Sequence, residues 1–117
     1  MAITLRDVSI ANFRTSMAAD NLNTQFMERL GSRVRYLPAR LAVGRSLSVG
    51  AQPEIVEQDG KVIKGETLFG ASLGVWLAFI VQHSEKKEMS LKDLQGLIAA
   101  HWARGLDILE RDWETTG

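Results

Sequence analysis

The sequence predicts a mainly α-helical fold, a single compact domain with a strand-helix-helix core and a C-terminal pair of helices. Apolar residues recur at helical spacing over most of the chain, and a short run near the N-terminus alternates in character as a strand does. The chain has 117 residues, the usual size of one domain, and a chain of this size buries roughly two-thirds of its unfolded surface. We therefore treat residues 1–117 as one domain.

The chain is expected to begin with a short helix and a short strand. Thr4 can cap the helix, with Asp7 as its capping-box partner at the third helical position. Residues 13–17 (FRTSM) then alternate in character and include β-branched and aromatic side chains. That pattern predicts a strand.

Two helices are expected to follow the strand. Asp20 or Asn21 can cap the first, which carries an apolar stripe and ends at Gly31. The second runs from about Leu37 to Leu47, with Pro38 in its first turn, where proline is favoured. Strand, helix, helix within residues 1–48 is the order of a ribbon-helix-helix unit, in which two chains pair their strands.

Residues 49–66 differ in composition from the helical parts. Asp59 and Gly60 lie between two short apolar pairs, which is typical of a tight hairpin turn that needs positive φ. We expect a small exposed hairpin or a loop insertion here. Its acidic residues would repel phosphate.

Residues 67–113 are expected to form a helix pair. The helix over 67–82 is apolar nearly all round, so either the rest of the fold or another subunit must cover it. Ser90 can cap the last helix, with Asp93 as its capping-box partner. Gly96 and Gly105 each cost that helix about 1 kcal/mol relative to alanine, which indicates close packing.

The stretch Arg29–Ser48 has the most distinctive charge pattern, because it holds five arginines and no acidic residue. The break between its two helices presents side chains to solvent, and guanidinium groups suit phosphate. We therefore expect a phosphate-binding face, with Arg14 added if the strand is exposed. The predicted DNA-binding residues are Arg14, Arg29, Arg33, Arg35, Arg40 and Arg45, with Arg33 and Arg35 the best candidates. Arg40 and Arg45 are the ones most open to a structural role, and the alternative for all six is a solvated surface or pairing with acids of the fold.

Charge is unevenly distributed although the formal net charge is zero. Residues 1–50 carry seven Lys and Arg against three Asp and Glu, and residues 51–117 carry seven against eleven. A local basic face can bind phosphate in a neutral protein. The alternative is that the two halves attract each other, within a subunit or across an oligomer.

Several functions are disfavoured by what the sequence lacks. Without cysteine there is no thiolate nucleophile or persulfide carrier, and the two histidines lack metal-site spacing. No catalytic set stands out, so we expect no enzyme, no cofactor and no metal. His101 is expected to be a hydrogen-bonded core histidine. With no signal-peptide pattern and no apolar run long enough to cross a bilayer, we expect a cytoplasmic protein without a membrane partner.

Three segments in order resemble one known family. They are RYLPARLAVGRSLS after a strand and a Gly-terminated helix, then GETLFGASLGVWLAFIV, and then the His-x-x-Arg-Gly run in HWARGLDIL. The chain resembles the DNA sulfur-modification protein family DndE over nearly its whole length. The segment around Asp59 and Gly60 does not match, and the basic residues of the arginine-rich stretch include no lysine.

The resemblance implies an accessory subunit for DNA phosphorothioation, in which sulfur replaces a non-bridging phosphate oxygen. Such a subunit would be a homo-oligomer, a tetramer, that binds the phosphate backbone of double-stranded DNA and prefers nicked duplex. Its other partners would be proteins of the sulfur-modification complex. Because the chain has no cysteine, it would not carry the sulfur itself.

Two other functions remain open from the sequence. One is a ribbon-helix-helix repressor or antitoxin, in which Arg14 with Thr15 or Ser16 would read the major groove. The other is an assembly scaffold that does not bind DNA and whose arginines meet protein carboxylates. Sequence specificity distinguishes the first from a backbone binder, and DNA binding by the protein alone distinguishes the second.

Overall fold

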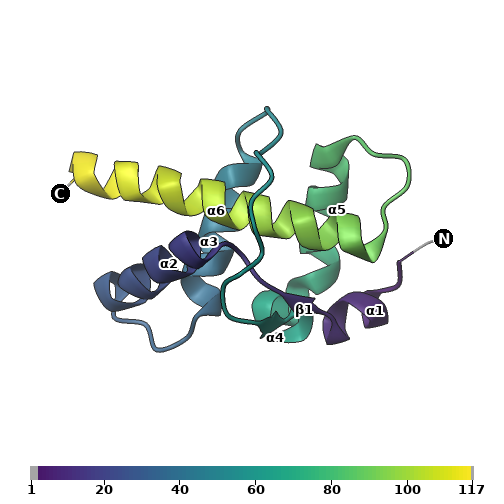
Figure 1. Cartoon of the computed structure of the whole chain (residues 1–117), viewed down its shortest axis with the longest axis horizontal. Helices are drawn as coiled ribbons and strands as arrows, with labels where there is room; N and C mark the ends of the chain where they lie inside the picture. Colours follow the sequence, from purple (N-terminus) through teal and green to yellow (C-terminus); the bar gives the residue numbers. More distant parts are fainter. Residues whose placement is uncertain (1–2, 117) are drawn as a thin grey trace.

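Six α-helices and a pair of two-residue strands make up the computed structural model, which describes residues 3–116 (Figure 1). The mainly helical class predicted from the sequence is confirmed. In chain order the elements are α1 (Leu5–Ile10), β1 (Asn12–Phe13), α2 (Met17–Leu30), α3 (Tyr36–Leu47), β2 (Ile63–Lys64), α4 (Gly65–Phe69), the 3-10 turn η1 (Gly70–Ser72), α5 (Leu73–Ser84) and α6 (Leu91–Thr116).

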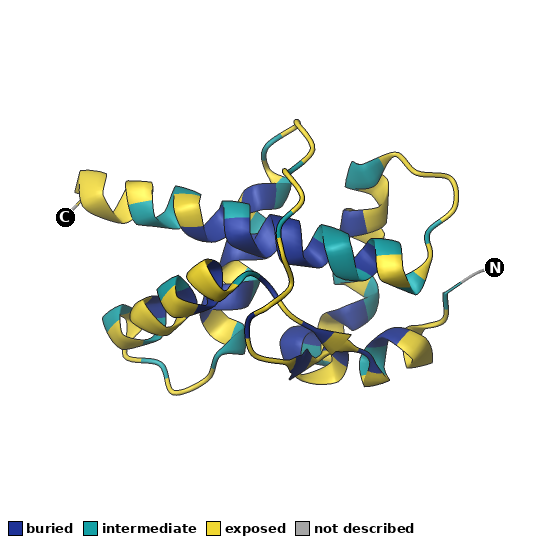
Figure 2. Ribbon diagram, in the orientation of Figure 1, coloured by how far each residue is buried: buried dark blue, intermediate teal, exposed yellow. Residues whose placement is uncertain are grey.

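Helix α6 runs along the length of the molecule, and its middle forms the centre of the core (Figures 1 and 2). Trp102 and Leu106 are fully buried there, and α3 crosses the same segment. A Cβ on Gly105 would lie 1.7 Å from the carbonyl oxygen of Ala42, so the two backbones meet where no side chain fits. The close packing expected at Gly105 is confirmed. At Gly96 a Cβ would meet nothing nearer than 3.9 Å, so no such packing exists there.

Most of the predicted helix ends are where the sequence placed them. Thr4 and Asp7 form the expected capping box, and Ser90 and Asp93 form the second one. Gly31 ends α2 in the left-handed conformation with φ 65°.

The predicted cap of α2 is wrong. Neither Asp20 nor Asn21 caps this helix, because Ser16 does so one turn earlier and accepts a hydrogen bond from the Ala19 N–H at 3.1 Å. Asp20 is buried instead, and its carboxylate faces Arg35 and the backbone of Lys61.

The expected strand is shorter and lies earlier than residues 13–17. Only Asn12–Phe13 pairs, antiparallel to Ile63–Lys64 of the same chain, with Asn12 opposite Lys64. Thr15 is fully buried and donates to the carbonyl of Ala99 at 2.9 Å. The order strand, helix, helix is present, and within the chain the strand pairs with β2.

Residues 49–62, here called the strap, form no hairpin. They run in an extended path across α6 to β2 (Figure 1). Gly60 donates its N–H to the Thr15 carbonyl at 2.9 Å, and the Asp59 carboxylate accepts from the Met17 N–H at 2.7 Å. The Asp-Gly pair therefore docks on the start of α2, which is why it does not form a tight turn within the strap.

The apolar helix expected over residues 67–82 is interrupted. Gly70 has φ +58°, and the break separates α4 from the 12-residue α5. The stretch Gly65–Ser84 is apolar enough in composition to cross a bilayer, with mean hydropathy 1.3. The break leaves α5 about 18 Å long, against roughly 30 Å of hydrocarbon.

Candidate nucleic-acid interface

The turn between α2 and α3 is held by backbone hydrogen bonds and by the hydroxyl of Ser32. Gly31 takes the left-handed conformation, which lets Ser32 donate its N–H back to the Met27 carbonyl at 2.8 Å. The Ser32 hydroxyl then accepts from the Val34 N–H at 3.1 Å. The turn is thus held on its inner side.

A buried polar relay anchors the turn to the core. The Trp102 indole donates to the Asn23 side-chain oxygen at 3.0 Å, and the Asn23 amide donates to the Arg35 carbonyl at 3.1 Å. Asn23 and Trp102 are both fully buried. The backbone entering α3 is therefore fixed relative to α6, which keeps the turn and its side chains in one position.

Arg33 lies at the tip of this turn. It is exposed, and within residues 3–116 its guanidinium makes no hydrogen bond and no ion pair. All five of its N–H donors are open to an incoming oxyanion. Among the six predicted arginines, it is the one best placed to meet a phosphate.

Three of the predicted arginines are ion-paired within the chain. Arg29 pairs with Glu110, Arg35 with Asp20, and Arg45 with Asp112. The hydrogen bond to Glu110 raises the pKa of Arg29, and the reciprocal bond lowers the pKa of the Glu110 carboxyl. A carboxylate beside each guanidinium offsets its attraction for phosphate. These pairs agree with the alternative that the arginines meet acids of the fold.

Arg14 and Arg40 bond only to uncharged oxygens. Arg14 donates to the Gly60 carbonyl at 3.2 Å, and Arg40 donates to the Leu68 and Thr67 carbonyls at 2.6 and 3.2 Å. Arg40 also lies 3.9 Å from the Tyr36 ring centroid. Neither arginine has a carboxylate within 4.0 Å among the described residues, so no ion pair offsets the attraction of either guanidinium for phosphate.

The six arginines do not form one cluster. Arg14 and Arg35 converge on the strap, because they donate to the neighbouring carbonyls of Gly60, Lys61 and Val62. Arg29 and Arg33 flank Gly31 on the turn, whereas Arg40 contacts α4 and Arg45 contacts the far end of α6. The positive charge is therefore spread along α3 and its two ends.

Sequence reasoning assigned no role to Arg104, although it lies in the His-x-x-Arg-Gly run. Its guanidinium donates to the Ser46 hydroxyl and carbonyl and to the Ala51 carbonyl. The Ser46 hydroxyl also bonds His101 Nδ1 at 2.8 Å, so the expected core histidine is confirmed. Burial, with the nearby His83 and Arg104, lowers the pKa of His101 to about 4, which keeps its ring neutral.

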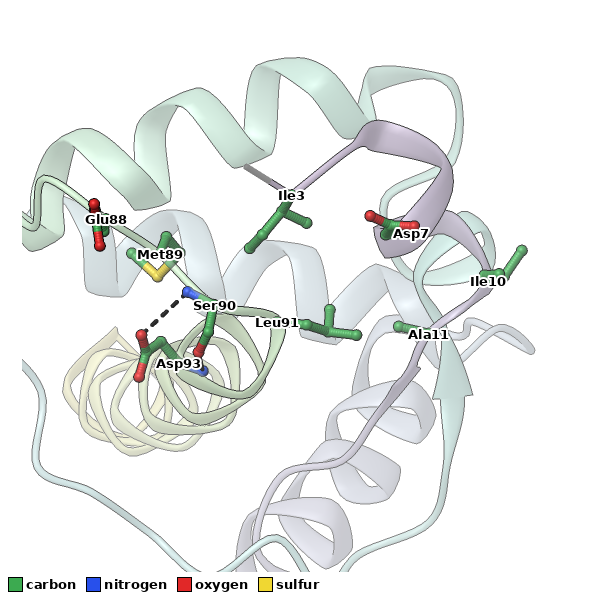
Figure 3. A pocket seen from close by; sticks show the side chains of 9 residues that line it. All are labelled: Ile3, Asp7, Ile10, Ala11, Glu88, Met89, Ser90, Leu91 and Asp93. Atoms are coloured by element: carbon green, nitrogen blue, oxygen red, sulfur yellow. Dashed lines mark hydrogen bonds between the residues drawn. The ribbon is translucent and has the colours of Figure 1, made fainter. Parts of the chain in front are cut away.

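A hollow of about 730 Å³ opens between α1 and the start of α6 (Figure 3). Its wall is apolar at Ile3 and Leu91, while Asp7 and Asp93 lie at helix N-termini with their carboxylates in the two capping boxes. No group of three or more His, Cys, Asp or Glu in residues 3–116 is placed to hold a metal ion. Carboxylates make this hollow a poor site for phosphate.

Comparisons with known proteins agree on one family. The family model described as DNA sulphur modification protein DndE matches residues 12–116. A comparison with curated protein sequences gave no match.

Two solved structures have the same fold. One is the crystal structure of DndE from Escherichia coli B7A involved in DNA phosphorothioation modification, with a TM-score of 0.73, 20% identity, and coverage of 84% of this chain and 94% of that chain. The other is a DndE mutant involved in DNA phosphorothioation, with a TM-score of 0.70, 20% identity, and coverage of 86% and 96%.

Proposed function

The chain belongs to the DndE family of DNA sulphur modification proteins, and from that premise we propose that it is the DNA-binding accessory subunit of a DNA phosphorothioation system. It contacts the phosphate backbone of double-stranded DNA, with nicked duplex as the preferred form. It acts in the cytoplasm beside other proteins of the modification complex and performs no catalytic step itself.

The observation that supports DNA binding is the exposed guanidinium of Arg33, which has no partner among residues 3–116 and lies on a turn fixed to the core. Arg14 and Arg40 add positive charge that no nearby carboxylate offsets. Arg29, Arg35 and Arg45 are ion-paired and contribute less to phosphate attraction, unless DNA displaces their carboxylate partners. Of the six, Arg33 is therefore the primary contact in this proposal.

The sulfur would be carried by another chain. A persulfide needs a thiol, and the sequence has no cysteine. Incubation of the purified protein with a desulfurase and labelled cysteine should leave this chain without a stable label. A covalent label on it would contradict the accessory role.

The oligomer, proposed as a tetramer, would form through the apolar surface of α5. Val75 and Phe79 are 58% and 56% exposed, and Trp76 and Leu77 are partly exposed beside them (Figure 2). Apolar side chains of this size on one short helix favour burial against another subunit. An oligomer would also repeat Arg33 on each subunit, so that weak contacts add up along the duplex.

One DNA-binding experiment tests the proposal against its rivals. The purified protein alone is titrated with intact, nicked and single-stranded DNA at two salt concentrations, and binding is followed by fluorescence anisotropy. Backbone contact predicts binding to unrelated duplex sequences that weakens linearly in a log–log plot against salt. Absence of binding at the lower salt contradicts the proposal and favours a scaffold.

The same titration separates the repressor alternative. A repressor prefers one operator by a factor of about 10³ or more over other sequences. In this fold Thr15 is buried and Ser16 caps α2, so two of the three side chains that would read bases are already engaged. We therefore expect no strong sequence preference.

A further inference from the structure

We propose that a hollow between the C-terminal end of α3 and the C-terminal half of α6 binds a phosphate oxyanion through Arg45, Arg104 and Arg111. The hollow measures about 430 Å³. Three arginines line it, and its apolar wall comes from Val49 and Ile108. Two of these arginines lie outside the stretch that the sequence singled out.

The charge of the hollow is positive overall. Among the described residues, Asp112 is the only acidic one that lines it, and its carboxylate lies 3.2 Å from the Arg45 Nε. Arg104 and Arg111 have no carboxylate within 4.0 Å in the described part of the chain. Two positive charges therefore remain without a counterion at one small site.

Arg104 is held rigidly but is not neutralised. Its Nε, Nη1 and Nη2 donate to the Ser46 hydroxyl, the Ala51 carbonyl and the Ser46 carbonyl at 2.8, 2.6 and 2.9 Å. All three acceptors are uncharged, and burial lowers the pKa of the guanidinium. A guanidinium has five N–H donors, so two remain for a ligand. An anion would relieve the cost of this partly buried charge.

The spacing on α6 places the other arginine on the same side. Arg104, Ile108 and Arg111 are four and three residues apart, so they share one face of the helix. Arg111 makes one long hydrogen bond, 3.5 Å to the Asp107 carbonyl, and its side chain can turn toward a ligand. Arg104 and Arg111 also line a neighbouring hollow beneath the strap, together with Glu54 and Asp107. Neither of these two carboxylates forms an ion pair with Arg104 or Arg111 in the described part of the chain.

Phosphate is the chemical class that fits. Guanidinium groups donate two parallel hydrogen bonds to its oxygens, and two or three such groups around one site neutralise its charge. The oxyanion can come from a DNA backbone or from free phosphate. Only the first source rests on the proposed function.

A DNA source would extend the contact along α3. Arg33 precedes the first turn of this helix, and the hollow lies at its last turn. The 12 residues of α3 cover about 18 Å, which corresponds to roughly five steps of one DNA strand at 3.4 Å each. The hollow would then be a second phosphate contact, separate from the α2–α3 turn.

The test uses Arg111→Gln, because Arg111 makes no contact that the fold depends on. The matched control is Lys92→Gln, an exposed cation on the same helix with no partner in residues 3–116. Inorganic phosphate is titrated into the full chain while the arginine side-chain N–H signals are followed by NMR. We expect saturable shifts at Arg45, Arg104 and Arg111, at least fivefold weaker binding in Arg111→Gln, and no change in Lys92→Gln.

The second arm measures DNA affinity against salt. If the hollow binds a DNA phosphate, Arg111→Gln should make the plot of log affinity against log salt concentration shallower by about 0.9 per site. Lys92→Gln should leave that slope unchanged. Phosphate shifts without a change of slope would support the site and assign it to free phosphate. No shift at these arginines in the wild-type chain would overturn the inference, even if Arg33 proves to bind DNA. Failure of all DNA binding would count against the proposed function alone, because the phosphate titration still decides the hollow.

Discussion

Nη2 of Arg35 lies 3.0 Å from Oδ1 of Asp20, and this ion pair closes the strap onto α2. The other Asp20 oxygen accepts the Lys61 N–H at 3.1 Å, while Arg35 also donates to the Lys61 and Val62 carbonyls. Asp20 is 3% exposed. Arg35, which the sequence ranked with Arg33 as a DNA contact, therefore has a structural role in the folded chain.

Replacing Arg35 by alanine should destabilise the protein by about 2–4 kcal/mol. The change leaves the Asp20 carboxylate buried without its partner and frees two strap carbonyls. Arg33→Ala is the matched control, and its unfolding free energy should stay within about 0.5 kcal/mol of wild type. Urea unfolding followed by circular dichroism measures both. Equal stability of the two variants would show that the pair contributes little.

Arg33→Gln should weaken binding to all duplex sequences about equally. The loss of one phosphate contact should reduce the salt slope by about 0.9 for each subunit that engages DNA. Arg29→Gln is the comparison within the arginine-rich stretch, because Glu110 already offsets much of its charge. Fluorescence anisotropy over a salt series gives both slopes. An unchanged slope in Arg33→Gln would remove the α2–α3 turn from the DNA surface.

Phe79→Glu should dissociate the oligomer and leave the subunit folded. Phe79 is 56% exposed in the single chain, so a charge there is solvated unless another subunit covers it. Leu73 is 8% exposed, and Leu73→Glu should unfold the protein instead. Light scattering reports the mass and circular dichroism reports the fold. A wild-type mass of 13 kDa at micromolar concentration would contradict the oligomer itself.

Gly105→Ala should cost more than 3 kcal/mol, whereas Gly96→Ala should stabilise by up to about 1 kcal/mol. The new Cβ at Gly105 would lie 1.7 Å from the Ala42 carbonyl oxygen, so α3 must move away from α6. At Gly96 the nearest atom would be 3.9 Å away, and only the helix propensity changes. Thermal unfolding of the two variants measures their stabilities, and both substitutions lie in α6.

Stability should fall as the pH is lowered from about 6.5 toward 4. The pKa of His101 is about 4 in the fold against 6.5 for the free side chain, so the unfolded chain binds the proton more readily. The stabilisation is complete above pH 6.5, and about 2–3 kcal/mol of it is lost by pH 4.5. His101→Asn should flatten this part of the profile in urea unfolding at pH 4.5, 5.5 and 7. A slope unchanged by that substitution would assign the titration to other groups.

The helices were predictable because their signals are local. The capping boxes at Thr4 and Ser90 and the end of a helix at Gly31 depend on residues within one turn, and all three were predicted correctly. The bounds of the strand and the conformation of the strap were not predicted correctly. Asp59 and Gly60 have a hairpin composition, but contacts with Thr15 and Met17, more than forty residues away in the chain, determine their conformation.

The candidate site also combines features that local sequence shows with features that depend on residues distant in the chain. Composition located the arginine-rich stretch, yet it could not tell Arg33 from Arg35, because Asp20 lies fifteen residues from Arg35 and shares no local pattern with it. Arg104 and Arg111 were overlooked because they lie in the acidic half of the chain. Their proximity to Arg45 exists only once α3 crosses α6.

The strap also bears on how the chain folds in time. Pairing β1 with β2 joins Asn12 to Lys64, and closing a loop of roughly 50 residues costs about 3.5 kcal/mol of chain entropy beyond a constant. Helical contacts join residues that are close in the sequence, so they can form before the folding transition state. The entropy cost of a long loop is offset only by contacts that form after it has closed. We therefore expect the contact between the Lys61 N–H and the Asp20 carboxylate, which needs the strap in place, to form late. Its loss should speed unfolding while leaving the folding rate nearly unchanged.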